Sequence, residues 1–172
     1  MKTISSILLC MLMLMVCACS VVNTQTKEQP KKLIIAVNTP HGVGYFADSA
    51  GTFLFNKQFE EVRSFSEGLS PVKQNGKWGF INTKGEVVVP CIYDKAGKFS
   101  EGLAYVQQNG NEGFINTQGE QVIPCIYDDA RSFSEGLARV KQNGKWSIIN
   151  TEGKVIVAEC DYWNTSWSVV EL

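Results

Sequence analysis

The feature that most constrains this chain of 172 residues is an internal repeat. The segment Phe-Ser-Glu-Gly-Leu occurs three times at equal spacing, at Phe65, Phe99 and Phe133, and it opens each copy. Without gaps, residues 65–94 are identical to 99–128 at 22 of 30 positions and to 133–162 at 18 of 30. Chance would give about two identities at an average residue frequency near one in twenty. Such a period is typical of small units that fold by stacking on their neighbours.

Within one copy, apolar and β-branched residues form short runs that are separated by turn residues. The sequence predicts three strands, at Leu69–Gln74, Trp78–Asn82 and Glu86–Val89. Pro90 is expected to end the third strand, because proline lacks the N–H that a strand ladder needs. Three strands joined by tight turns predict an antiparallel meander.

Two turn signals recur in every full copy. Asn75-Gly76 is the strongest short hairpin signal, because a type I′ turn needs positive φ at both central residues. It returns as Asn109-Gly110 and Asn143-Gly144. The stretch Asn82–Gly85 predicts a second turn, with glycine where positive φ costs least.

The predicted fold is all-β: tandem 34-residue antiparallel β-meander repeats, stacked into an elongated twisted array. A single meander of this length cannot bury enough apolar area to fold alone, so neighbouring copies must cover each other. The expected contacts between copies are made by aromatic residues, namely Phe65, Phe99, Phe133, Tyr93 and Tyr127. Propeller-like closure is the alternative, although closed propellers usually have at least four four-stranded blades.

The domain boundaries follow from the repeat. The β domain covers 33–172, with a divergent leading copy at about 42–64 and full copies at about 65–98, 99–132 and 133–162. Residues 163–172 are expected to cap the last copy, with Trp163 and Trp167 covering its exposed face. Terminal copies are expected to be atypical because they cover the ends of an array.

The first nineteen residues predict an export signal. Lys2 is followed by an apolar run from Ile4 to Ala18, which is too short to span a bilayer and fits a secretory signal. Val16-Cys17-Ala18-Cys19 resembles the bacterial lipoprotein signal, which implies removal of residues 1–18 and acyl chains on Cys19. A plain secretory signal cut near Ala18 is the alternative. Residues 19–32 then form a lipidated cysteine and a polar, flexible tether.

Several residues of the repeat carry a family resemblance. Asn-Gly-Lys-Trp-Gly-Phe-Ile-Asn-Thr-Lys-Gly at 75–85 resembles the WG, or KWG, repeat of bacterial proteins, and the resemblance covers roughly residues 42–162. It implies an exported repeat protein without an assigned active site. The repeat-signature residues are Gly68, Trp78, Gly79, Gly102, Gly113, Gly136 and Trp146. Glu112-Gly113 replaces Trp-Gly in one copy and Trp146-Ser147 loses the glycine in another, which argues against a functional role for the pair.

Composition limits the functions that remain. Sixteen basic residues face seventeen acidic ones, so no basic excess indicates nucleic-acid binding. His41 is the single histidine, which leaves no partner set for a Cys/His nucleophile or a His-rich metal site. We therefore expect no catalytic residue, no metal site and no cofactor.

Repeated polar and sulfur-bearing residues have two interpretations each. Cys91, Cys125 and Cys160 could form disulfides in an exported protein, but small buried side chains are the favoured interpretation. The acids at repeat positions Glu67, Glu101, Glu135, Asp94 and Asp128 could bind calcium or a basic partner. Turn chemistry is favoured for them, because one environment repeated three times does not separate two pKa values as an enzyme requires.

The remaining candidates are aromatic and basic. Trp78, Trp146, Phe80 and Phe114 could form a sugar-stacking face, but core positions are favoured for them. The lysines beside the Asn-Gly turns, at Lys73, Lys77, Lys141 and Lys145, could form a basic edge or simply protect the strand edges.

The function expected from the sequence is a non-catalytic binding or interaction scaffold of the cell envelope. Its partners would be the membrane, through acyl chains on Cys19, and a protein or envelope polymer, with the outer membrane as the expected location. One alternative is an envelope glycan hydrolase or accessory enzyme that uses Glu60-Glu61, the acidic pair that the full copies do not closely share. Another is a purely structural spacer.

Overall fold

The computed structural model describes residues 33–160, in which all regular secondary structure is β-strand. No helix in this part of the chain is long and apolar enough to cross a membrane. The predicted signal, Cys19, the tether and the cap tryptophans Trp163 and Trp167 lie outside the described residues. The strands are β1 (Ile35–Asn38), β2 (Gly44–Ala47), β3 (Phe53–Phe59), β4 (Glu61–Val62), β5 (Leu69–Gln74), β6 (Lys77–Asn82), β7 (Val87–Tyr93), β8 (Lys95–Ala96), β9 (Leu103–Gln108), β10 (Asn111–Asn116), β11 (Gln121–Tyr127), β12 (Asp129–Ala130), β13 (Leu137–Gln142), β14 (Lys145–Asn150) and β15 (Val155–Cys160).

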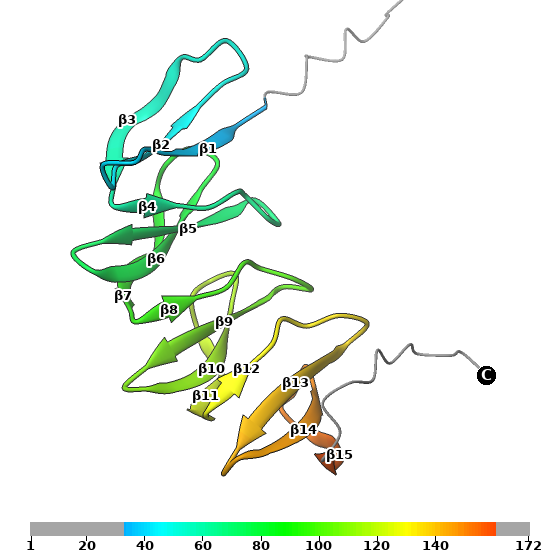
Figure 1. The fold of residues 1–172 in the computed structure, drawn as a ribbon. Coiled ribbons are helices and arrows are strands. Elements are labelled where there is room, and N and C mark those ends of the chain that lie inside the picture. The colour runs from blue at the N-terminus through cyan, green and yellow to red at the C-terminus, as the bar shows by residue number, and fades with distance from the viewer. Residues whose placement is uncertain (1–32, 161–172) are drawn as a thin grey trace, which may run out of the picture. The chain divides into compact units, whose positions relative to one another are not determined.

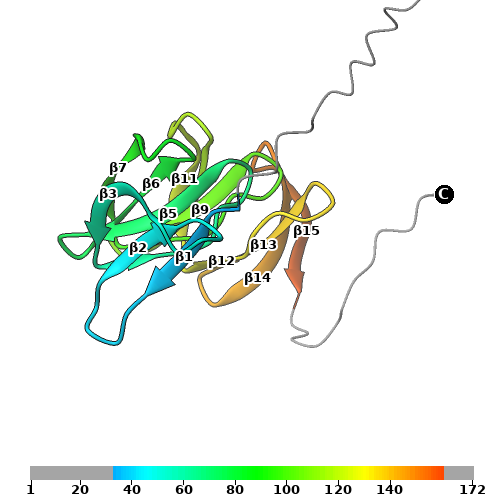
Figure 2. The same ribbon diagram turned by 90° about the horizontal axis from the view of Figure 1, so that it is seen from above.

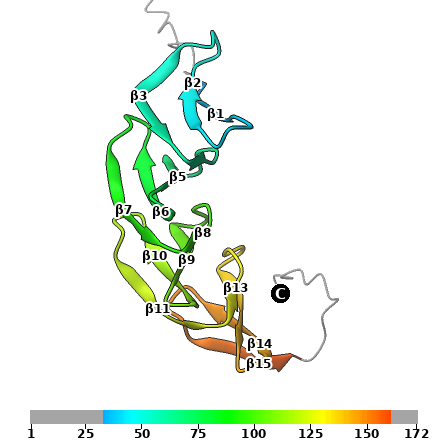
Figure 3. The same ribbon diagram turned by 60° about the vertical axis from the view of Figure 1, so that its left-hand side comes forward.

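These strands form four antiparallel sheets that follow one another in chain order (Figure 1). The leading sheet is three-stranded, β1-β2-β3, and the others are four-stranded meanders, β4-β5-β6-β7, β8-β9-β10-β11 and β12-β13-β14-β15. Figure 2 looks down this series, so that the sheets overlap in projection, and Figure 3 shows β7 and β11 along one side. The tandem meander fold is therefore confirmed, and the contacts between sheets join neighbours in the chain.

The prediction of three strands per copy was incomplete. A short strand of two residues, β4, β8 or β12, precedes each full meander and pairs with its first long strand, as Ala96 does with Val106. Two residues are too few to carry an alternating pattern, so this strand has no local signal in the sequence. The sheets consequently begin a few residues before the Phe-Ser-Glu-Gly-Leu segments.

The hydrophobic cores lie between sheets, as stacking requires. Phe80 of β6 packs edge-on against Phe99 before β9, with ring centroids 4.9 Å apart, and Phe114 meets Phe133 in the same way at 4.8 Å. Tyr93 and Tyr127 are buried in the two corresponding clusters. Phe65, which faces the leading sheet, is only half-buried, and its ring centroid lies 5.1 Å from that of Phe46. The predicted aromatic contacts between copies are thus confirmed.

Both predicted turns are present, and a third was missed. Asn75 and Gly76 have φ of 52° and 75°, which fits the predicted type I′ turn. Asn82 closes the second turn by accepting hydrogen bonds from the backbone N–H groups of Lys84 and Glu86, at 2.9 and 3.0 Å. The missed turn is Ser-Glu-Gly-Leu, in which glutamate itself takes positive φ at all three occurrences, Glu67, Glu101 and Glu135.

Candidate functional site

Each sheet contains a bulge on its last strand, and in the second and third sheets the repeated glycine lies opposite it. The expectation that Pro90 ends a strand was wrong: β7 runs through Pro90 to Tyr93. Since β7 is an edge strand, its proline need not donate to a ladder. Trp78 pairs with Tyr93 and Phe80 with Val89, so three residues bulge out opposite Gly79.

The bulge explains the glycine of the signature. A Cβ built on Gly79 would lie 2.5 Å from the carbonyl oxygen of Val89, and one on Gly113 would lie 2.6 Å from that of Ile123. In the last sheet Ser147 replaces the glycine, and there only two residues lie between the paired positions Val157 and Cys160. In the two sheets with a three-residue bulge, the bulged backbone therefore leaves no room for a Cβ, and the position requires glycine.

The tryptophan position of the signature is occupied in different ways in the three full copies. Trp78 is buried, with the Arg63 guanidinium 4.0 Å above its ring, and Trp146 lies near two arginines. Glu112 takes this position in the middle copy and is 4% exposed. Its Oε2 accepts the Ala130 N–H at 2.7 Å and its Oε1 lies 3.6 Å from Lys95 Nζ. Burial raises the pKa of Glu112, against the lowering effect of the Ala130 N–H.

The glutamate position of Phe-Ser-Glu-Gly-Leu links successive copies. Glu67 accepts two hydrogen bonds from the backbone N–H groups of Glu101 and Gly102, at 2.7 and 2.9 Å. Glu101 does the same to Glu135 and Gly136, at 2.5 and 2.8 Å. The favoured turn chemistry is confirmed for these two acids, but they cap the turn of the next copy rather than their own. Gly68, Gly102 and Gly136 supply the second left-handed residue of these turns.

The serine before this glutamate adds a third hydrogen bond between successive copies, and we call this set of contacts the Ser-Glu ladder. Ser66 Oγ donates to the carbonyl oxygen of Phe99 at 2.7 Å, and Ser100 Oγ donates to that of Phe133 at 2.9 Å. The first two Ser-Glu pairs therefore each present one hydroxyl donor and one carboxylate to a carbonyl and two amides of the following turn. In Figure 1 the three turns, after β4, β8 and β12, project from the same side.

Two further acids of the repeat also accept hydrogen bonds from backbone N–H groups. Glu60 Oε2 accepts the Gly76 N–H at 2.9 Å, and Asp128 accepts the equivalent Gly144 N–H at 3.2 Å. Glu60 lies one repeat period before Asp94, so it belongs to the repeat and is not peculiar to the leading copy. A hydrogen bond from Lys77 lowers the pKa of Asp94. Among residues 33–160, no three His, Cys, Asp or Glu side chains are grouped to hold a metal ion.

Cys91 and Cys125 are free thiols that are partly buried. Each thiol lies 3.8 Å from a carbonyl oxygen of its own sheet, that of Val72 or Val106. Burial raises the pKa of both thiols, so they stay protonated and unreactive at neutral pH. The favoured packing role agrees with this placement, although the burial is incomplete.

The predicted sugar-stacking residues are core residues in three cases. Trp78, Phe80 and Phe114 are buried between sheets, and Trp146 is half-buried. Among the residues whose burial is described, the one exposed aromatic side chain lies instead on the leading sheet. Phe53 is 67% exposed and packs edge-on against Tyr45, with ring centroids 4.6 Å apart.

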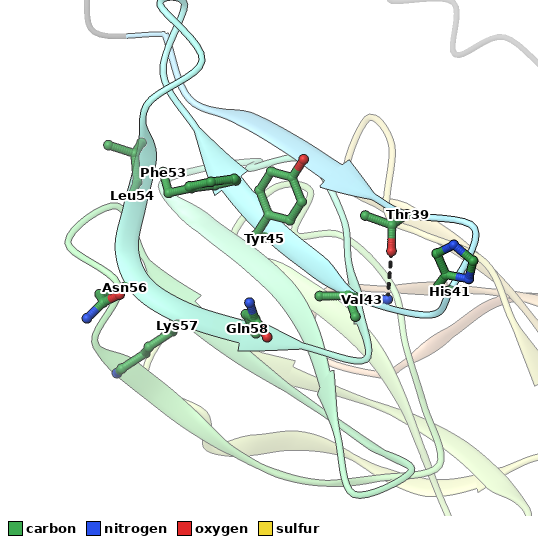
Figure 4. Close-up of a pocket in the computed structure, with 9 residues that line it drawn as sticks. All are labelled: Thr39, His41, Val43, Tyr45, Phe53, Leu54, Asn56, Lys57 and Gln58. Carbon is green, nitrogen blue, oxygen red and sulfur yellow. Dashed lines mark hydrogen bonds between the residues drawn. The ribbon is translucent and has the colours of Figure 1, made fainter.

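These two rings line a hollow of about 670 Å³ over the leading sheet (Figure 4). The other lining side chains come from the β1–β2 turn and from β2 and β3, namely Thr39, His41, Val43, Leu54, Asn56, Lys57 and Gln58. Thr39 Oγ1 accepts the Val43 N–H at 3.1 Å, which orders the turn. Lys57 Nζ donates to the Gly85 carbonyl at 3.0 Å, which links the hollow to the next sheet.

The hollow arises where the leading copy departs from the repeat. Gly44 pairs with Phe59 and Phe46 with Leu54, so four residues bulge from β3, one more than in β7. Tyr45 occupies the position that Gly79 holds one repeat period later. The longer bulge therefore carries Asn56, Lys57 and Gln58, while Tyr45 stands where β6 and β10 have no side chain. Phe55 and Asn56 take φ of 65° and 43°, and such backbone strain is concentrated at binding sites.

Sequence reasoning missed the hollow. Tyr45 at the place of a repeated glycine was the available signal, because a large side chain there requires a changed bulge. Phe53 gave no signal, since exposure is not readable from a single apolar residue.

Comparison with known families supplies one match. The sequence model of the family described as WG containing repeat matches three times, at residues 46–78, 78–111 and 113–146. Comparison with the curated proteins gives no match.

Proposed function

The chain belongs to the WG containing repeat family, and we propose that it is a non-catalytic binding scaffold of the cell envelope, anchored by lipid on Cys19. The observation that carries the binding role is the hollow on the leading sheet, lined by Tyr45 and Phe53. Repeat arrays commonly act by presenting surfaces rather than by catalysis. The leading copy is where this array departs most from its own pattern.

The lining of the hollow fits a neutral polymer rich in hydroxyl or amide groups, such as an envelope glycan. The exposed Phe53 ring and the half-buried Tyr45 ring offer apolar surface, and the side chains of Asn56 and Gln58 offer both donors and acceptors. Lys57 is the one fully charged side chain of the lining, and it is engaged with the Gly85 carbonyl. Pockets with an apolar wall and a few polar groups are typical of such binding.

A hydrolytic role has less support. Glycoside hydrolysis uses two carboxyl groups that flank the scissile bond, whereas the nine residues that line the hollow include no carboxylate. Glu60 caps the Gly76 turn, and a carboxylate oxygen of Glu61 lies 3.6 Å from the guanidinium of Arg63, two residues later in the chain. These contacts support structural roles for the pair.

The binding role is tested with Phe53→Ala and the full-length chain. Insoluble cell-wall glycan is sedimented with the protein, and the bound fraction is measured against protein concentration. Because Phe53 is mostly exposed, its loss should leave the fold intact while the bound fraction falls severalfold. Ile92→Ala is the matched control, since Ile92 is 48% exposed on an edge strand away from the lining. Equal binding by both variants, or no binding by the unaltered chain, contradicts the proposal and favours a structural spacer.

Anchoring rests on the sequence alone. Val16-Cys17-Ala18-Cys19 places a small residue directly before a cysteine at the end of an apolar run. Several acyl chains on one residue give stable attachment, whereas a single chain is marginal. An anchored scaffold would hold its leading sheet within reach of envelope polymers.

A further inference from the structure

The first Ser-Glu turn has no preceding Ser-Glu turn among the described residues, so its backbone hydrogen-bonding groups are not occupied in the way that those of the next two turns are. In the second and third turns, a carboxylate from the preceding copy occupies the two backbone N–H groups. In the first turn the equivalent groups are the N–H of Glu67 and of Gly68. Among residues 33–160 no acceptor binds either group. Gly68 is correspondingly exposed, whereas Gly102 and Gly136 are half-buried.

The carbonyl of this turn is open as well. Phe99 and Phe133 each accept a serine hydroxyl from the preceding copy through their carbonyl oxygens. The equivalent carbonyl, that of Phe65, receives no such hydroxyl from the described residues. The first turn thus displays two donors and one acceptor. In the second and third turns the same three groups are bound by a carboxylate and a serine hydroxyl.

We propose that the Glu67 and Gly68 amides and the Phe65 carbonyl form a binding site for an acidic peptide turn that presents adjacent serine and glutamate side chains. The carboxylate bridges the two amides, and the serine hydroxyl donates to the carbonyl. Two adjacent N–H groups in a left-handed turn form a concave site with positive partial charge, which suits a carboxylate. Charge-assisted hydrogen bonds of this kind are about twice as strong as neutral ones.

The backbone of the first turn is already arranged for this ligand. Glu67 and Gly68 have φ of 51° and 78°, against 55° and 76° for Glu101 and Gly102, whose amides are occupied. The empty turn therefore has nearly the same conformation as the filled one, so binding requires little rearrangement. This site goes beyond the proposed function and does not depend on the hollow.

The test is an NMR titration of the full-length chain with a cyclic hairpin peptide that carries the sequence Phe-Ser-Glu-Gly-Leu. We expect the amide signals of Glu67 and Gly68 to shift downfield in a saturable manner, while those of Gly102 and Gly136 stay unchanged. A peptide with glutamine in place of glutamate should bind at least tenfold more weakly. No saturable shift at Glu67 and Gly68 in the millimolar range overturns the proposal.

A variant that opens a second site provides the internal control. Glu67→Ala removes the carboxylate from the Glu101 and Gly102 amides but leaves the Glu67 N–H in place. In this variant acetate should also shift the Glu101 and Gly102 amides, because Ser66 still donates to the Phe99 carbonyl and only the two amides are left open. Ile92→Ala, which changes an exposed side chain outside both sites, should bind one peptide, as the unaltered chain does. If acetate shifts neither Glu101 nor Gly102 in Glu67→Ala, the assignment of a carboxylate to such a pair of amides is wrong.

Two further arms identify the source of the carboxylate. Acetate should shift the same amides only at much higher concentration, because it lacks the hydroxyl contact, and equal potency of acetate contradicts recognition of a turn. Sedimentation of the chain alone shows whether a second copy supplies the turn. Self-association that the peptide competes away supports a second copy as the occupant, and self-association that the peptide does not affect contradicts it.

Discussion

The crowding opposite the bulge predicts that Gly79→Ala destabilises the second sheet. The new Cβ would lie 2.5 Å from the Val89 oxygen and 2.7 Å from both Cys91 N and Pro90 C. All three are backbone atoms, so no side-chain rotation relieves the contact and β7 must move. Overpacking of this kind costs about 1–3 kcal/mol, and we expect a value near the upper end because the neighbours are backbone.

Gly76→Ala separates this overpacking cost from the cost of placing alanine in a left-handed backbone conformation. Gly76 has φ of 75°, and nothing lies within 4 Å of a Cβ built there. Its substitution therefore measures only the left-handed backbone penalty, about 1–2 kcal/mol. Gly79 does not have positive φ, so its substitution measures only the crowding. Urea unfolding of the full-length chain, followed by tryptophan fluorescence, gives both free energies.

The last sheet supplies the rescue experiment. It carries Ser147 opposite a bulge of two residues, whereas Gly79 faces three. Gly79→Ser combined with deletion of Pro90 copies that arrangement. The double variant should lose less stability than the sum of the two single changes, which is the sign of direct coupling. Strict additivity, or a Gly79→Ala cost below that of Gly76→Ala, would refute the crowding argument.

Three other changes have defined outcomes. Burial raises the pKa of Glu112, so the folded chain keeps this proton to a higher pH than the unfolded chain does. The free energy of unfolding therefore falls as the pH rises from the ordinary glutamate pKa through the raised one. Glu112→Gln, in which the amide oxygen still accepts the Ala130 N–H, should remove that slope in urea unfolding at a series of pH values. Glu67→Gln should speed hydrogen exchange of the Glu101 amide severalfold, because a neutral acceptor replaces the carboxylate, and unchanged exchange would count against the ladder. Cys19→Ala should move the protein from the membrane to the soluble fraction and remove acyl chains from the mature N-terminus, as mass spectrometry would show.

The repeat made most of the fold predictable. The regular period, the Asn-Gly turns and the aromatic contacts at Phe99 and Phe133 all follow from residues whose physical preferences are strong and local. The fourth strand was not predictable, because Lys95–Ala96 is ordered by pairing with β9 and by core contacts with residues distant in the sequence. The prediction that Pro90 ends its strand was wrong for a related reason. Whether a proline ends a strand depends on whether that strand is at the edge of its sheet.

The candidate sites were less predictable than the fold. Glu67 was correctly assigned to turn chemistry, but the amide that it caps belongs to the next copy and cannot be read from its neighbours in the chain. The hollow depends on how many residues bulge from β3, and that number follows from pairing between strands. In both cases the chemistry is set by contacts between sequence-distant segments, whereas single-sequence patterns report the local ones.

The internal copies also indicate where function can lie. A position with the same contact in successive copies is already explained by the array: Glu67 and Glu101 cap the next turn, and Gly79 and Gly113 admit the bulge. Such residues cannot be freed for a ligand without loosening a junction. Binding chemistry is therefore expected where the pattern changes or begins, which in this chain means Tyr45 opposite the longer bulge and the uncapped amides of the first turn.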